Sequence, residues 1–359
     1  MLDTYGWSEP LQRLFHDHAA RGLIPGRVTV QQRGHYGLVI ATGEVAGELS
    51  GRFHFEAEAG GYPVAGDWVA CTPPVEKGPV MIQALLPRAT SFVRREPNGG
   101  RAQVVAANID LALLVASLNA DLNARRIERY LATAWESGAQ PVVVLTKLDT
   151  CADPEPLIEE IRAVAYGVEV HAVSAVTGEG IAGLSALLAP GKTAVLLGSS
   201  GVGKSTLVNA LAGQELMETQ EIREDDARGR HTTTHRELVL LPSGGLMLDT
   251  PGMRELGLWN ADAGLATAFG DLEGEVEALA AQCKFRDCKH VAEPGCAVRA
   301  ALESGELDAE RWEAYGKLQR ELAHLDRKEN PAAASQARKV WIQRQKDMRQ
   351  RTKHRETDD

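Results

Sequence analysis

Residues 193–213 read TAVLLGSSGVGKSTLVNALAG, and this stretch decides the fold. An apolar strand pattern, TAVLL, leads into a glycine-rich loop, and the apolar segment LVNALAG follows with a helical pattern. The loop matches Gly-x₄-Gly-Lys-Ser, in which backbone N–H groups at a helix N-terminus face phosphate oxygens. We therefore predict a phosphate-binding loop in an α/β domain. Its residues are Gly198, Ser199, Ser200, Gly201, Val202, Gly203, Lys204, Ser205 and Thr206.

Two residues of this loop carry specific chemistry. Lys204 is expected to place its ammonium group on the β and γ phosphates, where it stabilises negative charge. The hydroxyl of Ser205 is expected to bind Mg²⁺. The sequence therefore predicts a nucleoside triphosphate with a bound magnesium ion.

Base recognition is predicted from two earlier strand ends. The strand PVVVL ends in Thr146-Lys147-Leu148-Asp149, which resembles the Asn-Lys-x-Asp motif of guanine-binding proteins. Asp149 can accept from guanine N1–H and N2–H₂ together, and Lys147 can lie along the base. Threonine in place of asparagine weakens one supporting contact, and a surface turn explains the tetrapeptide alone equally well. The next strand, VEVHAVS, ends at Ser174-Ala175, where a backbone N–H would contact guanine O6.

The expected γ-phosphate motif is Asp249-Thr250-Pro251-Gly252, which follows the hairpin pattern ELVLL-PSGG-LML. Asp249 would hold Mg²⁺ through water, and the Gly252 N–H would contact the γ-phosphate. The polar stretch 218–237 before the hairpin is typical of a switch ordered by nucleotide. Among its three consecutive threonines we favour Thr233 as the residue that completes the Mg²⁺ shell.

Met253 follows Gly252, where many GTPases have a glutamine that orients water. Methionine cannot do this. His231, in the expected switch, is the nearest candidate to position the water, and a phosphate or RNA contact within the loop explains it equally well.

The order of the motifs indicates a circularly permuted GTPase. The base motifs at 146–149 and 174–175 precede the phosphate loop, whereas an ordinary GTPase begins with that loop. A compact domain tolerates such a rearrangement because its natural termini lie close together. We expect hydrolysis of GTP to GDP and phosphate.

A separate metal site is predicted near the C-terminus. The pattern C-x₄-C-x-H-x₅-C is suited to one closed, tetrahedral structural zinc ion rather than to a catalytic metal, and incidental thiols are the alternative. Its ligands would be Cys283, Cys288, His290 and Cys296. Cys71 and Cys151 stand alone in the sequence and are expected to be buried thiols.

The chain divides by pattern into a multidomain α/β protein. Short strands broken by glycine and proline predict an OB-like β-barrel, with a generic β-domain as the alternative. Apolar strands alternating with amphipathic helices predict a mostly parallel sheet covered on both faces. The expected parts are an N-terminal lead (1–26), the barrel (27–92), a linker (93–103), the permuted GTPase domain (104–258) and a helical zinc domain (259–359).

Charge and hydropathy constrain the partners. A formal net charge of −10 argues against a protein that coats nucleic acid over its whole surface. From Arg338 to Arg355, however, eight Lys or Arg residues accompany one acid, which indicates either an RNA contact or a solvated helix face. No signal peptide or long apolar run is present, so we expect a cytoplasmic protein without a membrane partner. We also expect a monomer.

Six segments are informative when taken together: GSSGVGKST, GRHTTT, DTPGMRELGLW, FRDCKHVAEPGCAV, Gly66-Asp67-Trp68-Val69 and Ala107-Asn108-Ile109-Asp110. With the permuted order of the motifs, they resemble the ribosome small-subunit-dependent GTPase A family of bacteria. The resemblance covers nearly the whole chain. It implies a GTPase of late small-subunit maturation that contacts ribosomal RNA through its barrel and zinc domains and is slow until the subunit stimulates it. It also implies that the family's catalytic histidine corresponds to His231, its phosphate-loop Lys and Ser to Lys204 and Ser205, and its zinc ligands to the residues above.

Two other functions fit the motifs. One is a nucleotide-gated RNA-binding assembly scaffold with incidental hydrolysis, which the basic C-terminal segment and the missing glutamine favour. The other is a GTPase that acts on a different RNA, such as tRNA. GTP turnover measured with and without small subunits distinguishes the stimulated enzyme from the scaffold.

Overall fold

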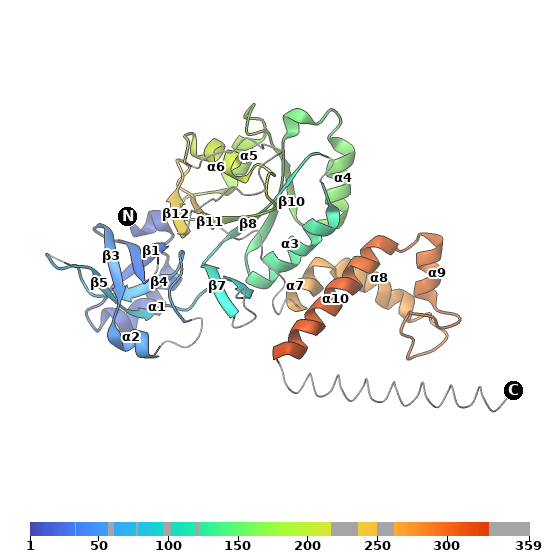
Figure 1. The fold of residues 1–359 in the computed structure, drawn as a ribbon, viewed down its shortest axis with the longest axis horizontal. Helices are drawn as coiled ribbons and strands as arrows, with labels where there is room; N and C mark the ends of the chain where they lie inside the picture. The colour runs from blue at the N-terminus through green and yellow to red at the C-terminus, as the bar shows by residue number, and fades with distance from the viewer. Residues whose placement is uncertain are drawn as a thin grey trace, which may run out of the picture. The chain divides into compact units, whose positions relative to one another are not determined.

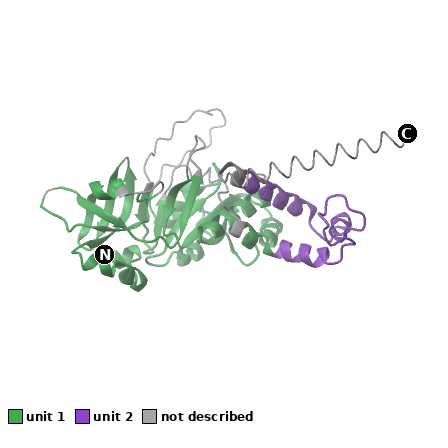
Figure 2. Ribbon diagram, turned by 90° about the horizontal axis from the view of Figure 1, so that it is seen from below, with its two compact units in different colours: residues 1–257, 263–270 green, residues 258–262, 271–359 purple. Residues whose placement is uncertain are grey.

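The computed structural model describes residues 1–32, 34–56, 61–76, 78–95, 102–119, 122–216, 236–249 and 262–329. The chain forms two compact units (Figure 2). The first contains residues 1–257 and 263–270, and the second contains residues 258–262 and 271–359.

The first unit begins with a small closed barrel. After the 3₁₀ turn η1 (Leu2–Tyr5) and helix α1 (Glu9–Ala19), its elements are β1 (Ile24–Gln32), β2 (His35–Ile40), β3 (Gly43–Leu49), α2 (Gly51–Glu56), β4 (Trp68–Cys71) and β5 (Val80–Leu85). The strands pair in the order β1-β2-β3-β5-β4, and β4 pairs back to β1. Only the β3–β5 pair in this barrel is parallel. The predicted OB-like barrel is confirmed, with β1 starting inside the segment expected as a lead.

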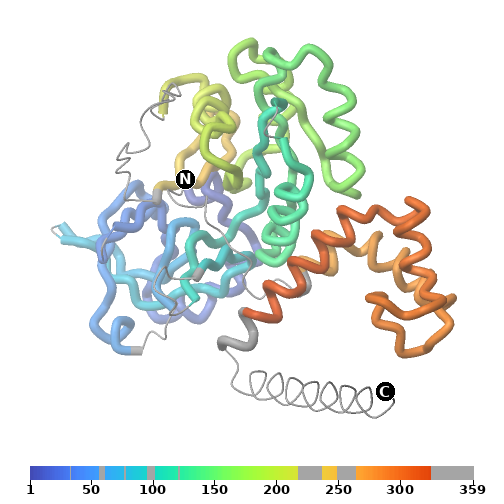
Figure 3. The backbone as a smooth tube through the Cα atoms, turned by 45° about the vertical axis from the view of Figure 1, so that its right-hand side comes forward, coloured from blue at the N-terminus to red at the C-terminus, as the bar shows by residue number. Residues whose placement is uncertain are grey.

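Beyond the barrel, the described residues form six further strands of the same continuous sheet. Helices lie on both faces of this part of the sheet (Figures 1 and 3). Its strands are β8 (Leu111–Ser117), β9 (Gln140–Thr146), β10 (Glu169–Ala172), β11 (Thr193–Leu197), β12 (Arg236–Leu240) and β13 (Leu246–Asp249). The spatial order is β10-β9-β8-β11-β13-β12, and every pair is parallel except β12–β13. The helices of this region are α3 (Ala124–Ser137), η2 (Leu148–Thr150), α4 (Glu155–Val164), α5 (Ile181–Leu187), α6 (Lys204–Ala212) and α7 (Asp262–Ala268).

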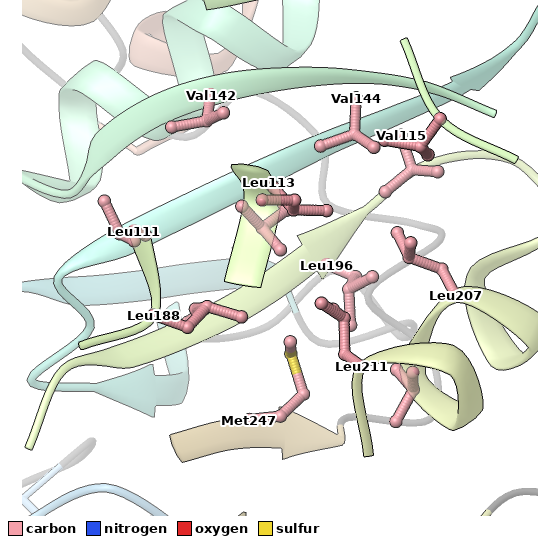
Figure 4. Packing of buried hydrophobic residues seen from close by; sticks show 14 of the residues in the cluster. Leu111, Leu113, Val115, Val142, Val144, Leu188, Leu196, Leu207, Leu211 and Met247 are labelled. Atoms are coloured by element: carbon pink, nitrogen blue, oxygen red, sulfur yellow. The ribbon is translucent and has the colours of Figure 1, made fainter. Parts of the chain in front are cut away.

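The sheet is buried on both faces, as its apolar strands predict. Alternate residues of β8, β9 and β11 form one cluster with side chains of α5 and α6 (Figure 4). Labelled members are Leu111, Leu113, Val115, Val142, Val144, Leu188, Leu196, Leu207, Leu211 and Met247. The intervening residues, such as Leu114 and Val143, are also fully buried, and α3 packs with α4 over the other face.

The predicted linker is not a simple connection. Within the described residues, β6 (Ser91–Arg95) and β7 (Ala102–Ala107) pair as an antiparallel hairpin. The intervening Pro-Asn-Gly-Gly sequence, which lies outside the described residues, is a hairpin-turn signal that the sequence reading missed.

Barrel and sheet share backbone hydrogen bonds and a buried arginine. Strand β12 pairs antiparallel with β1, and β1 and β12 lie side by side in Figure 1. Arg27 of β1 is 2% exposed, and its guanidinium donates to Thr193 Oγ1 at 2.8 Å, to Asn108 O at 3.2 Å and to Tyr5 O. It also lies over the Trp68 ring. Burial lowers the pKa of Arg27 to about 10, so the side chain remains charged at neutral pH.

The second unit is helical. Its elements are α8 (Gly270–Ala280, whose first residue belongs to the first unit), α9 (Ala297–Ser304) and α10 (Ala309–Glu329). Arg311 of α10 forms two hydrogen bonds with the Asp271 carboxylate of α8, at 2.7 and 2.8 Å. These contacts agree with the predicted helical C-terminal domain.

The position of α7 differs from the boundary expected at residue 259. Apart from its first residue, this helix belongs to the first unit, where the Gly264 N–H donates to Glu136 of α3 at 3.0 Å. A Cβ at Gly264 would lie 2.1 Å from Ala132 O, so glycine allows this close packing. Among the helices whose residues the structure describes, we find none with the length and hydropathy needed to cross a membrane.

Replacing Arg27 with methionine tests the joint between barrel and sheet. The change keeps the approximate volume but leaves the Thr193, Asn108 and Tyr5 acceptors without their donor. We expect the free energy of unfolding to fall by roughly 2–4 kcal/mol, measured by denaturant titration. Arg162→Met on α4, which removes only solvent-exposed ion pairs, is the matched control and should unfold like the wild type. Equal midpoints for Arg27→Met and the control would show that the arginine does not stabilise the joint.

Candidate functional site

The predicted motifs meet at one edge of the sheet. In the parallel register Leu114 lies opposite Leu197, Ser117 opposite Thr146, and Leu145 opposite Ala172. The segments that follow β8, β9, β10 and β11 therefore leave the sheet at the same carboxyl edge, where open α/β sheets bind ligands. The phosphate loop and both base motifs are among these segments.

The phosphate loop has the backbone that its glycines predict. Gly201 and Gly203 have φ angles of 80° and 89°, which favour glycine, and α6 begins directly after Gly203. A Cβ at Gly198 would lie 2.4 Å from Val115 O of β8, so glycine is required for the close approach of loop and strand. Helix α6 therefore begins at the loop, and a helix N-terminus in this position is suited to binding an anion.

The lysine and hydroxyl groups of the loop lie at the start of α6. Lys204 Nζ donates to Gly198 O at 2.8 Å and to Ser199 O. Ser205 is half-buried and Thr206 is exposed in the first turn. The ammonium group thus lies within the loop that is expected to surround the phosphates.

The two base motifs are joined by a short hydrogen bond. Ser174 is fully buried, and its hydroxyl donates to Asp149 Oδ1 at 2.6 Å. The same hydroxyl accepts from the Thr177 N–H at 3.1 Å. Lys147 has a φ of 61°, which turns the chain so that the Leu148 N–H reaches Val173 O. An exposed carboxylate held by a buried serine is well placed to accept from a guanine base.

Thr146 has a contact that the sequence did not predict. Its side chain is buried, and Oγ1 lies 2.6 Å from Val202 O of the phosphate loop and 3.2 Å from Ala116 O. A hydroxyl has one proton, so the shorter contact to Val202 is the stronger candidate for the hydrogen bond. The residue that replaces the usual asparagine therefore connects the base motif to the phosphate loop.

The remaining predicted nucleotide residues are only partly described. Ala175 is half-buried after β10, and Asp249 is the last residue of β13. Thr233, His231 and Gly252 lie outside the described residues, as does the basic segment from Arg338 to Arg355.

Helix α3 contributes a further contact with the phosphate loop. Arg126 Nη1 donates to Ser199 Oγ at 3.0 Å. No motif marks this arginine in the sequence. Its place in the first turn of a helix that follows a central strand was the available signal, because such helices start at the carboxyl edge of the sheet.

The four predicted metal ligands lie together in the second unit. Their ligand atoms all lie within 4.8 Å of one another. Cys283 Sγ is 3.9 Å from Cys296 Sγ and 3.7 Å from His290 Nδ1, and His290 Nδ1 is 3.4 Å from Cys296 Sγ. Bonds of standard length to a tetrahedral zinc would separate two sulfurs by about 3.8 Å and a sulfur from a nitrogen by about 3.6 Å. The donor set and its spacing therefore fit zinc.

A backbone N–H group supports this cluster. The Arg299 N–H in the first turn of α9 donates to Cys296 Sγ at 3.4 Å. N–H donors at a helix start stabilise thiolate charge. The cluster thus has the surroundings expected of a thiolate metal site.

Glu293 shapes the loop between the ligands and was missed by sequence reasoning. Its carboxylate accepts from the N–H groups of Lys289, Val291 and Ala292 at 2.9–3.0 Å. Hydrogen bonding by the backbone N–H groups lowers the pKa of Glu293 to about 2. His290 has a φ of 59°, so this turn places a ligand in a left-handed conformation. Of the two other thiols, Cys71 is buried as expected, whereas Cys151 is half-buried.

Comparisons with known proteins agree with this arrangement. Residues 85–259 match the RsgA GTPase family. The small ribosomal subunit biogenesis GTPase RsgA 1 of Listeria innocua is 46% identical over 330 residues, which are 92% of each chain. The RsgA protein of Opitutus terrae, which carries the same description, is 45% identical over 350 residues, or 95% of each chain.

Two solved structures share the fold. YjeQ from Thermotoga maritima superposes with a TM-score of 0.61 at 29% identity, covering 84% of this chain and 98% of that chain. YloQ, described as a circularly permuted GTPase, gives a TM-score of 0.58 at 24% identity and covers 84% of this chain and 95% of that chain; it supports the fold alone. From the motif order, the shared sheet edge and these relatives, we conclude that the chain is a GTP-hydrolysing enzyme that belongs to the RsgA GTPase family.

Proposed function

We propose that this GTPase acts in the late maturation of the small ribosomal subunit and is stimulated by that subunit. The observation that carries the proposal is near full-length similarity, at about 45% identity, to relatives described as small ribosomal subunit biogenesis GTPases. The barrel, the permuted site and the Cys/His cluster are all included in the aligned length, so the likeness extends beyond GTP hydrolysis to the whole architecture.

The roles that we propose for the nucleotide-binding residues follow from their positions along the carboxyl edge of the sheet. Asp149, held by Ser174, reads the guanine base, with Lys147 along its face and the Ala175 N–H near O6. The loop N–H groups and Lys204 hold the phosphates. Magnesium, when bound, neutralises phosphate charge, and Ser205, Thr233 and Asp249 are the residues proposed to hold it. His231 is proposed to position the water, and the Gly252 N–H to contact the γ-phosphate.

Zinc and RNA contacts complete the proposal. We propose one structural zinc ion held by the four Cys/His ligands, with ribosomal RNA contacted by the barrel, the zinc region and the basic C-terminal segment. We retain the predicted division into barrel, permuted GTPase domain and C-terminal domain as a proposal, with α7 moved to the GTPase domain. A monomer in the cytoplasm, without a membrane partner, stays a prediction.

A second candidate function is a nucleotide-gated assembly scaffold in which hydrolysis is incidental. Met253 favours it, because no side chain that orients water follows Gly252. The scaffold and the stimulated enzyme differ in whether turnover responds to the partner.

The deciding experiment is GTP turnover titrated against purified small and large ribosomal subunits. We expect at least a tenfold increase with small subunits and none with large ones, because a partner must complete a site that lacks the glutamine. A Lys204→Ala variant, titrated identically, controls for contaminating GTPases. Unchanged turnover with bound small subunits would favour the scaffold. If another RNA stimulated turnover and the small subunit did not, that RNA would be the partner of this GTPase.

Thr146→Val tests the contact between base motif and phosphate loop. Valine has nearly the same shape but no hydroxyl, so Val202 O loses a buried donor. We expect affinity for both GDP and GTP to fall by about tenfold, since one lost buried hydrogen bond is worth roughly 1–2 kcal/mol. Calorimetric titration with each nucleotide measures this. Unaltered affinities would show that the threonine contact does not organise the loop.

Cys288→Ser tests the metal site. We expect the purified wild type to hold one zinc ion per chain by atomic emission spectrometry and the variant to hold far less, because three ligands do not close a tetrahedral site. Cys151→Ser, which removes a thiol outside the cluster, is the matched control. Zinc content that is unaffected by Cys288→Ser would reject the assignment of this ligand.

A further inference from the structure

The phosphate loop is contacted by an arginine from a neighbouring helix. Strand β8 leads into α3, whose first residue, Ala124, follows the cap Asn123. Asn123 Oδ1 accepts from the Arg126 N–H at 3.0 Å, which fixes the first turn of α3. From this turn Arg126 Nη1 donates to Ser199 Oγ at 3.0 Å.

Ser199 is the point where two cationic side chains meet the loop. Its hydroxyl accepts from Arg126, and its carbonyl accepts from Lys204 Nζ. The preceding residue, Gly198, packs directly on Val115 O of β8. The start of the loop is therefore fixed from β8, from α3 and from its own lysine, while Thr146 fixes its far end through Val202.

We propose that Arg126 is a positioning residue of the GTP site, which holds Ser199 so that the loop N–H groups face the phosphates before the nucleotide binds. The inference rests on the proposed assignment of residues 198–206 as the phosphate loop. A preorganised loop loses less conformational entropy on binding, so the hydrogen bond to Ser199 increases affinity for nucleotide.

This role differs measurably from that of a catalytic arginine. Loop N–H groups that hold phosphates common to GDP and GTP contribute equally to both complexes and to the transition state. Loss of an interaction that stabilises the bound substrate and the transition state equally raises KM and leaves kcat unchanged. An arginine that stabilises charge developing on the transferred phosphoryl group would instead lower kcat.

The first experiment compares Arg126→Met with Arg126→Lys in the full-length protein. Methionine removes the donor, and lysine retains the charge and one donor. We expect Arg126→Met to weaken GDP and GTP binding equally, by about 10- to 100-fold, as expected for a lost hydrogen bond to a charged group, with KM raised and kcat within about twofold. Arg126→Lys should recover most of the affinity. Arg162→Met, on α4, is the matched control and should behave as the wild type.

A double-mutant cycle with Ser199→Ala isolates the proposed contact, because Arg126 has further contacts besides Ser199. Ser199→Ala alone should weaken GDP binding to a similar degree, and the double variant should bind no worse than Arg126→Met. Three results would overturn the inference: additive losses, a fall in kcat at constant KM, or unchanged nucleotide affinity in Arg126→Met. Lack of GTP binding by the wild type would instead reject the proposed site itself.

Discussion

The parallel pairing of β8 with β9 on one side and β11 on the other is the constraint on which the site depends. Strand β9 carries the base motif and β11 carries the phosphate loop, and β8 holds the two at fixed register. The packing between them is close: Gly198 lies on Val115 O, and Thr146 Oγ1 lies between Ala116 O and Val202 O. A side chain at residue 198 would separate the loop from β8 and misalign the two halves of the site.

Circular permutation leaves these pairings intact and changes what the sheet is joined to. Glu237 of β12 lies opposite Asp249 of β13 on one side and opposite Val30 of the barrel strand β1 on the other. Glu237 is therefore the one β12 residue between the barrel strand β1 and Asp249, the proposed magnesium ligand. Arg27 adds a second connection, because it bonds to the first residue of the phosphate-loop strand, Thr193. Barrel and nucleotide domain are joined by hydrogen bonds as well as by the chain.

Much of this architecture follows from local sequence, because glycine, cysteine and apolar patterns have direct structural consequences. The barrel, the permuted sheet, the loop of residues 198–206 and the Cys/His cluster were all predicted from such patterns. The contacts of Arg27, Arg126 and Glu293 were not, because each depends on which distant or neighbouring backbone groups the fold brings within reach. Thr146 shows the same limit. Its sequence position indicated a weakened base contact, whereas its hydroxyl lies against the phosphate loop, a partner 56 residues along the chain.

The charge of the chain explains why these local contacts matter. A protein with a formal net charge of −10 does not attract a nucleoside triphosphate through its overall field. Binding must then come from short-range donors, and backbone N–H groups are effective only where the loop already holds them in the right direction. Glycines allow that conformation but do not enforce it, since they also allow many others. Side chains that contact the loop from outside, Thr146 and Arg126, restrict the choice, and a chain of net negative charge can in this way bind a highly charged ligand.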